Sequence, residues 1–195
     1  GAIRLRDAEA TLCAYLMQPR PVLPCEVVGL AGNVAEGELI KAIAVPWLAI
    51  CREIARDPNF LYQFAHSPRN FEEFIAACYD RAGFDEVILT ARSGDHGRDV
   101  IAVKAGHLSV RFLDQCKAYS ANHVVPANDV RAMLGVLTGD RNTSKGFITT
   151  TATFAPGINT DPIISPYIPY RLELRDGRRL REWLLTLVAS GDVTL

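Results

Sequence analysis

The sequence has no excess of charge of either sign. Its 21 Lys and Arg residues nearly balance its 22 Asp and Glu residues, which gives a formal net charge of -1 at pH 7. Bulk charge therefore does not favour a nucleic-acid partner, and any basic surface that binds one would have to be local.

The sequence also lacks a long apolar run and paired cysteines. Charged residues and a proline interrupt the longest apolar stretch, residues 40–54, which excludes a membrane span there. Charged side chains occupy the start of the chain, where a signal peptide would need an apolar core. The five cysteines form no C-x-x-C pair, so they predict neither a zinc ribbon nor a disulfide framework. Reduced, mostly buried thiols in a cytoplasmic protein are the expectation.

The chain does have enough apolar residues for a real core, since 49% of its 195 residues are hydrophobic. Its first part predicts a helix over 5–17, a short strand over 25–30, and a helix over 38–55 that is kinked or divided at Pro46. We therefore expect a small, mostly helical appendage over 1–58 and a main domain over 59–195. The first residues are Gly-Ala and not Met, which suggests a piece of a longer protein.

The main domain predicts a mixture of helices and strands. Ser67 and Pro68 are typical of a helix start and Gly83 of a helix end, so we expect a helix over 71–81. Apolar patterns separated by Gly, Pro and Asp turns predict strands over 84–91, 100–104, 108–119, 146–151 and 170–174, and helices over 130–137 and 178–188. The order indicates an α/β fold.

Two connections in this domain have their own signals. Asn128 or Asp129 is the expected N-cap of the helix over 130–137. The segment 154–169 contains four prolines, so a long ordered loop is expected there in place of a helix. Such a loop could form part of a surface for DNA or for a partner.

Three polar residues on neighbouring strands form the candidate reaction centre. Asp99 stands before the strand over 100–104, and Gln115 and Lys117 lie two apart near the end of the strand over 108–119. Residues two apart on a strand share a face, and an antiparallel partner brings Asp99 beside them. Carboxylate and amide oxygens are hard ligands for Mg²⁺, and an ammonium can orient water or stabilise charge on phosphate oxygens. The three together suit metal-assisted hydrolysis of a phosphodiester.

Each of these residues also has an ordinary structural reading. Asp99 could be a turn residue that bonds its own backbone, and Lys117 could be a solvated charge at a strand end. Gln115 is harder to explain in this way, because a buried amide needs hydrogen-bond partners. It is the joint arrangement that favours a reaction centre.

The spacing D-x15-Q-x-K resembles that of the PD-(D/E)XK nuclease superfamily. The sequence around these residues resembles the Mrr-type restriction endonuclease branch of that superfamily. The D-x-G-x-D turn of that branch corresponds to residues 95–99, and its Q-x-K to residues 115–117. This resemblance implies an αβββαβ core with a mixed central sheet. It also implies that Asp99 and Gln115 are metal ligands and that Lys117 is catalytic.

A second stretch adds to the resemblance. D-P-x-x-L-Y-x-x-x-x-S-P-R-x-F-E-E-F, followed by A-G-F, resembles the beginning of Mrr-type catalytic domains. The resemblance implies that Glu72 supports the site, with Glu73 as the alternative. Taken alone, either glutamate could simply favour the helix dipole in a first turn.

The resemblance implies a Mg²⁺-dependent DNA endonuclease, with Mn²⁺ able to replace Mg²⁺, that acts in restriction or antiviral defence. Double-stranded DNA is the expected partner, in a homodimer or with an additional targeting domain or subunit, and without a membrane. Candidate DNA-contacting residues are Arg92, Arg98, Arg178 and Arg179. The alternatives are a non-catalytic nucleic-acid or protein-interaction module that keeps the nuclease fold, and a structure-specific DNA resolvase.

Overall fold

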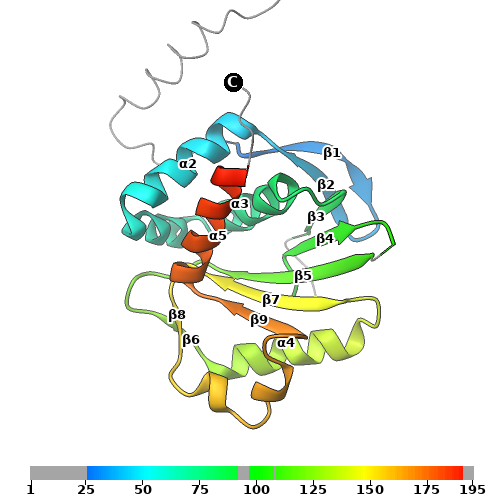
Figure 1. Cartoon of the computed structure of the whole chain (residues 1–195), viewed down its shortest axis with the longest axis vertical. Coiled ribbons are helices and arrows are strands. Elements are labelled where there is room, and N and C mark those ends of the chain that lie inside the picture. Colours follow the sequence, from blue (N-terminus) through cyan, green and yellow to red (C-terminus); the bar gives the residue numbers. More distant parts are fainter. Residues whose placement is uncertain (1–25, 92–96, 108, 191–195) are drawn as a thin grey trace, which may run out of the picture.

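The computed structural model describes residues 26–91, 97–107 and 109–190 (Figure 1). The helix predicted over 5–17 lies outside these residues, as do Arg92 and Asp95. Within the described ranges, no helix combines the length and the apolar character that crossing a bilayer requires.

A seven-stranded mixed sheet runs through the middle of the molecule, in the order β1-β2-β3-β4-β5-β7-β9. The first five strands are antiparallel to their neighbours, whereas β5, β7 and β9 run parallel. The strands are β1 (Val28–Val34), β2 (Gly37–Ala42), β3 (Glu86–Thr90), β4 (Val100–Lys104), β5 (Val110–Lys117), β7 (Lys145–Thr150) and β9 (Leu172–Arg175). Two short strands, β6 (Val124–Val125) and β8 (Thr153–Phe154), pair separately. The mixed α/β fold predicted from the sequence is confirmed.

Helices cover both faces of the sheet (Figure 1). One core cluster joins the sheet to α2 (Ala44–Arg56), α3 (Pro68–Arg81) and α5 (Gly177–Ser190), and a second joins it to α4 (Ala127–Gly139). Neighbouring residues of a strand enter opposite cores, as when Val100 packs in the first cluster and Ile101 in the second. Because both faces are buried, β3 and β4 are apolar nearly throughout, whereas β5 also contains charged and amide side chains.

Helix α3 follows the sequence signals closely. It begins at Pro68 directly after Ser67, whose side chain makes no capping hydrogen bond, and the chain turns away at Gly83 with φ +82°. Phe71, Phe74 and Cys78 are fully buried at helical spacing. A 3₁₀ segment, η1 (Pro58–His66), leads into this helix.

The prediction for residues 38–55 was partly wrong. Residues 37–42 form β2, which pairs with both β1 and β3, and the helix begins only at Ala44. Gly37 lies so close to β3 that a Cβ there would be 2.3 Å from the Leu89 carbonyl oxygen, so this pairing requires glycine. The pairing outweighs the helical pattern of the stretch. The described part of the expected appendage is therefore a hairpin followed by one helix, and it shares the sheet and the core of the main domain.

Helix α4 is longer than predicted, because Pro126 occupies its N-cap position and residues 128 and 129 lie in the first turn. Neither residue caps the helix, contrary to the expectation. The proline-rich segment is an ordered loop as expected, with two short 3₁₀ turns, η2 (Ile158–Thr160) and η3 (Ser165–Tyr167). Ile158 and Ile164 anchor this loop in the core beside α4.

Candidate active site

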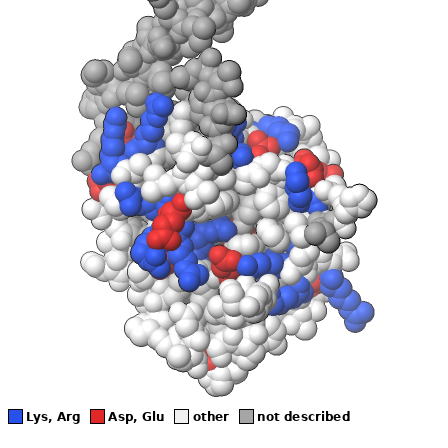
Figure 2. Space-filling model, viewed as in Figure 1, with Lys and Arg blue, Asp and Glu red and all other residues white. Residues whose placement is uncertain are grey.

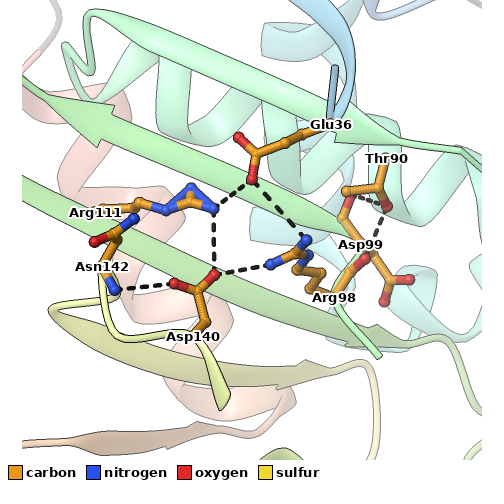
Figure 3. Close-up of polar contacts among 7 residues, drawn as sticks. All are labelled: Glu36, Thr90, Arg98, Asp99, Arg111, Asp140 and Asn142. Atoms are coloured by element: carbon orange, nitrogen blue, oxygen red, sulfur yellow. Dashed lines mark hydrogen bonds and ion pairs between the residues drawn. The ribbon is translucent and has the colours of Figure 1, made fainter. Parts of the chain in front are cut away.

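Asp99 lies at the start of β4, where the pairing with β5 becomes irregular. Val100 is the residue that pairs with Asp114, yet the Asp99 N–H also donates to the Asp114 carbonyl, at 2.9 Å, so two consecutive residues oppose one residue of β5, as in a β-bulge. The Asp99 Oδ2 accepts a hydrogen bond of 2.7 Å from the Cys116 N–H. Thr90 at the end of β3 donates its N–H to the Asp99 carbonyl at 3.0 Å, and its hydroxyl donates to the Arg98 carbonyl at 2.7 Å and to the Asp99 carbonyl at 3.2 Å (Figure 3). The backbone at Asp99 is thus held from both neighbouring strands.

Gln115 and Lys117 lie on the face of β5 that α4 covers. Leu113, two residues earlier on this strand, packs in the core cluster of α4, and alternation places Gln115 and Lys117 on the same side. Asp99 precedes β4 and reaches β5 through its side chain, which bonds the backbone of Cys116, the residue between Gln115 and Lys117. The strand period therefore places Gln115 and Lys117 on one face, with Asp99 bound to the residue between them.

The side-chain oxygen of Gln115 is buried and has no hydrogen-bond partner among the described residues. A buried amide oxygen without a donor is costly, so such an atom needs a donor or a cation. A Cβ at Gly97 would lie 3.5 Å from the Gln115 Nε2 and 3.4 Å from the Val136 Cγ2. Gly97 has φ +78°, so the turn before β4 passes closely over this amide only because glycine is present.

This unpartnered oxygen fits a hard divalent cation. Mg²⁺ prefers oxygen ligands, keeps several waters and takes part of its coordination from a substrate phosphate. In the described part of the chain, no cluster of three or more His, Cys, Asp or Glu side chains is placed to hold a metal. An ion here would therefore depend on one carboxylate, that of Asp99, and on the neutral amide of Gln115.

Lys117 has a partner that the sequence analysis missed. Its Nζ lies 3.5 Å from the Oδ2 of Asp129, and both side chains are about a quarter to a third exposed, at 25% and 30%. Asp129 was interpreted only as a helix cap, because Asn-Asp before an apolar run is a common capping signal. The ammonium predicted to act on the reaction is thus held by a carboxylate from the first turn of α4.

Glu72 approaches β5 from α3, on the other side of the sheet. Its carboxylate accepts a hydrogen bond of 2.8 Å from Arg69, whose guanidinium also donates to the Thr90 carbonyl at 2.9 Å. Glu73, the alternative residue, lies 3.7 Å from the same guanidinium. Arg69 therefore ties both glutamates to the end of β3.

Cys116 shows that several carboxylates converge on this part of β5. Burial raises the pKa of its thiol well above the ordinary value, and the charges of Asp114, Asp99 and Glu72 raise that pKa further, while Arg175 lowers it. These influences indicate that Glu72 and Asp99 lie near the same residue from different directions. The thiol stays protonated at neutral pH, so it is not a nucleophile.

Asp114 forms a buried network that sequence reasoning also missed. Its Oδ2 accepts hydrogen bonds from Tyr79 and Thr149 at 2.8 Å each and from Arg175 at 3.3 Å. Burial raises the pKa of Asp114, and the Arg175 guanidinium and the two hydroxyl donors oppose that shift. The guanidinium also stacks on Trp183, 4.0 Å from the ring centroid. The sequence did contain one signal for this network, namely the acidic residue Asp114 next to the apolar residues of β5.

The candidate DNA-contacting arginines differ in their surroundings. Arg178 is exposed and pairs with Glu182 at 2.7 Å. Arg179 donates to the Leu174 carbonyl at 3.2 Å and lines, with Arg178, a cleft of about 510 Å³ beside the proline-rich loop. Arg98 is instead bound to Asp140 at 2.8 Å. Figure 2 shows basic and acidic side chains interspersed over the face in view, with basic ones gathered where α5 begins.

Comparison with protein families gives one match. A family model described as restriction endonuclease, Mrr_cat, matches residues 65–184, which include all four predicted site residues. Curated proteins give no match to the chain.

Two solved structures are similar to this chain. The MspJI restriction endonuclease in complex with a 27-mer oligonucleotide has a TM-score of 0.50 and 19% sequence identity, over 77% of this chain and 33% of that one. The DNA modification-dependent restriction endonuclease AspBHI has a TM-score of 0.47 and 19% identity, over 90% of this chain and 45% of that one. The chain thus spans less than half the length of either. The likeness to MspJI supports the fold.

Proposed function

Because the chain belongs to the restriction endonuclease family, we propose that it cleaves DNA by hydrolysing phosphodiester bonds with the help of a divalent metal ion. The observation that carries the proposal is the buried, unpartnered oxygen of Gln115, which lies on the same strand face as Lys117 and directly precedes Cys116, the residue whose N–H binds the Asp99 carboxylate. A neutral oxygen acceptor beside a carboxylate suits a hard cation better than it suits protein packing.

In this proposal Asp99 and Gln115 hold Mg²⁺, or Mn²⁺ in its place. When bound, the ion would neutralise charge that develops on the phosphate oxygens and would activate water. The Cys116 N–H fixes the orientation of the Asp99 carboxylate. The Gln115 residue is partly exposed, but its Oε1 atom is buried and so would offer an ion an oxygen that is shielded from solvent.

Lys117 orients the attacking water or stabilises the charge on the phosphate. The Asp129 carboxylate holds the ammonium beside the site in the free protein. Glu72 supports the site through Arg69, which links it to the end of β3 just before the turn that leads to Asp99.

Double-stranded DNA is the proposed substrate, and restriction of foreign DNA in the cytoplasm is the proposed role. Arg178, which is exposed, and the proline-rich loop beside it would contact the DNA backbone. Because the chain spans a third of the MspJI chain, an additional targeting domain or subunit is part of the proposal. Cutting both strands calls for two such sites, which a homodimer would supply.

Incubation with a supercoiled plasmid across a magnesium titration tests the proposal. We expect nicked and linear DNA to appear with Mg²⁺ or Mn²⁺ and to be absent with EDTA. An Asp99→Ala protein that folds normally should give no product. Equal cleavage by the wild type and the Asp99→Ala variant would contradict the proposal.

A non-catalytic binding module is the second candidate. The observation that favours it is the single carboxylate among the two proposed metal ligands, together with the ion pair that engages Lys117. Such a module would retard DNA in a gel without nicking it at any magnesium concentration. The same titration therefore distinguishes the two candidates.

A further inference from the structure

A cleft of about 560 Å³ lies where strand β5, the end of helix α4 and two turns meet, next to the candidate active site. Its charged wall comes from the turn between β1 and β2, the residue before Asp99, the start of β5 and the loop after α4 (Figure 3). The lining residues that matter here are Glu36, Arg98, Arg111, Val136, Asp140 and Arg141.

Two arginines in this cleft share the same two carboxylates. Asp140 Oδ2 lies 2.8 Å from Arg98 and 3.3 Å from Arg111. Glu36 Oε1 lies 2.6 Å from Arg111 and 3.9 Å from Arg98. The guanidiniums are only 20% and 16% exposed, so their orientation is already fixed in the free protein.

The two carboxylates are held differently. Asp140 is 14% exposed and also accepts the backbone N–H of Asn142 through Oδ1, at 3.1 Å. Glu36 is 39% exposed and stands on a hairpin turn, where the described residues give it only the two arginines as partners. Asp140 is therefore a fixed part of the wall, whereas Glu36 can leave without breaking other contacts.

The cleft has positive charge and hydrogen-bond donors to spare. Arg141 is exposed and forms no ion pair with any described residue, so three guanidiniums face two carboxylates. The Arg111 guanidinium donates to Glu36 and Asp140, its side-chain partners among the described residues, through Nη2 alone. Its Nε and Nη1 are therefore available as donors. Guanidinium groups bind phosphate oxygens in this way, often through two parallel hydrogen bonds.

The cleft shares a wall with the proposed metal site. Val136 lines the cleft, and its Cγ2 would be 3.4 Å from a Cβ at Gly97, the same position that contacts the Gln115 amide. Arg98 directly precedes Asp99 in the chain. A DNA strand whose phosphate is cleaved at Asp99 and Gln115 would therefore carry a neighbouring phosphate toward this cleft.

We propose that Arg98 and Arg111 bind a backbone phosphate of the DNA strand, and that the Glu36 carboxylate takes the place of this phosphate in the free protein. This inference rests on the proposed function for the identity of the ligand. Binding of the strand would displace Glu36 from Arg111, while Asp140 would keep both guanidiniums in position. Glu36 would thus weaken the binding of DNA in general, without reading its sequence.

The test is the affinity for a labelled DNA duplex, measured by fluorescence anisotropy in EDTA over a series of salt concentrations. Glu36→Gln should bind about fivefold more tightly at low salt, since removing one competing surface charge changes the free energy by up to about 1 kcal/mol. The slope of log K against log salt should stay close to that of the wild type, which makes the same phosphate contact once Glu36 is displaced, whereas Arg111→Gln should reduce the slope by about 0.9. In an Arg111→Gln background, the Glu36→Gln change should have a smaller effect, because only the weaker pair with Arg98 at 3.9 Å remains.

Glu53→Gln is the matched control, because it removes one carboxylate that pairs with an arginine, Arg56, on α2 away from the cleft. It should leave both the affinity and the slope unchanged. Thermal unfolding checks that each variant folds. If Arg111→Gln does not fold, the affinity of the single Glu36→Gln variant, compared with that of Glu53→Gln, tests the proposal. Equal behaviour of Glu36→Gln and Glu53→Gln would overturn the proposal. An Arg111→Gln protein that folds and keeps the wild-type salt slope would overturn the phosphate assignment in favour of a base contact.

The plasmid assay separates this inference from the proposed function. If Glu36→Gln tightens binding but the wild type never nicks DNA, the cleft binds phosphate and the hydrolytic proposal fails. If the wild type nicks DNA and Glu36→Gln changes nothing, the cleft assignment fails and the hydrolytic proposal stands.

Discussion

Polar side chains on the two faces of strand β5 differ in the hydrogen-bond donors that surround them. On the face toward α3, Asp114 is 1% exposed, and one of its oxygens accepts three hydrogen bonds from neighbouring elements. On the face toward α4, the Gln115 oxygen is buried without any such donor among the described residues. The other Asp114 oxygen, Oδ1, is likewise buried without a partner among the described residues, so the two residues differ in the three donors that bind Asp114 Oδ2. Those donors tie Asp114 to neighbouring elements, whereas the proposed metal ion would be the partner of the Gln115 oxygen.

Substitutions on the α4 face should have the largest effect, and that effect should be on cleavage. Lys117→Ala and Asp99→Ala should reduce the cleavage rate by about 10³-fold or more, the usual cost of losing a group that stabilises transition-state charge. The melting temperature should change little, because neither side chain is fully buried. Plasmid nicking and thermal unfolding measure the two quantities. Undiminished nicking by Lys117→Ala would remove the proposed role of that residue.

A substitution on the α3 face should act on stability. Asp114→Ala leaves the Arg175 guanidinium, which is 8% exposed, without its carboxylate, and we expect a loss of about 3–5 kcal/mol in the free energy of unfolding. Urea denaturation measures this loss. Asp85→Ala is the control, because Asp85 pairs with Lys104 at an exposed hairpin and should matter little. A loss no greater than that of the control would show that the network does not stabilise the protein.

Gln115→Glu tests the proposed metal-binding role of Gln115, because it replaces a neutral amide with a negatively charged carboxylate. A neutral ligand leaves the metal one negative charge short, so the glutamate variant should bind Mg²⁺ more tightly and reach half-maximal cleavage at a lower magnesium concentration. Calorimetric titration with Mg²⁺ measures the affinity, and Gln115→Leu, of similar size without oxygen, should abolish binding. Weaker binding by the glutamate variant would contradict the assignment of Gln115 as a ligand.

The smallest expected effect is a loss of stability at alkaline pH that comes from Cys78, a buried residue of α3. Burial raises the pKa of Cys78 from 9.0 to about 12, and the hydrogen bond from Trp47 opposes this shift. The unfolded chain therefore loses this proton at lower pH than the folded protein, so stability should fall as pH rises from about 9 to about 12. Cys78→Ala should reduce this dependence, as measured by urea denaturation at several pH values. An unchanged dependence would exclude Cys78 as its source.

Much of the fold could be predicted because local signals and tertiary structure agree. Strand β4 has the predicted bounds, and α3 has the buried positions and the terminal glycine that its sequence indicated. The stretch 38–55 was partly misassigned, because its first residues complete the sheet beside β3, and that pairing cannot be read from local periodicity. Propensity predicted a helix there, and strand pairing prevailed.

The candidate site could be predicted only where chain spacing determines neighbours. The strand period was enough to place Gln115 and Lys117 on one face, and the short connection between β4 and β5 brought Asp99 beside Cys116. The partners that come from distant elements were missed, namely Asp129 for Lys117 and Arg175 for Asp114. A sequence shows that a charge lies in an apolar strand, but it does not show which of many opposite charges reaches that point.

The most direct test of the central claim is the position of a bound cation. Crystals grown with MnCl₂ would give an anomalous difference peak for Mn²⁺. We predict a peak coordinated by the Asp99 carboxylate and the Gln115 Oε1, with the Lys117 ammonium beside it. A map with no peak between these two oxygens at saturating Mn²⁺, or with a peak only at other residues, would contradict the assignment of this strand pair as the reaction centre.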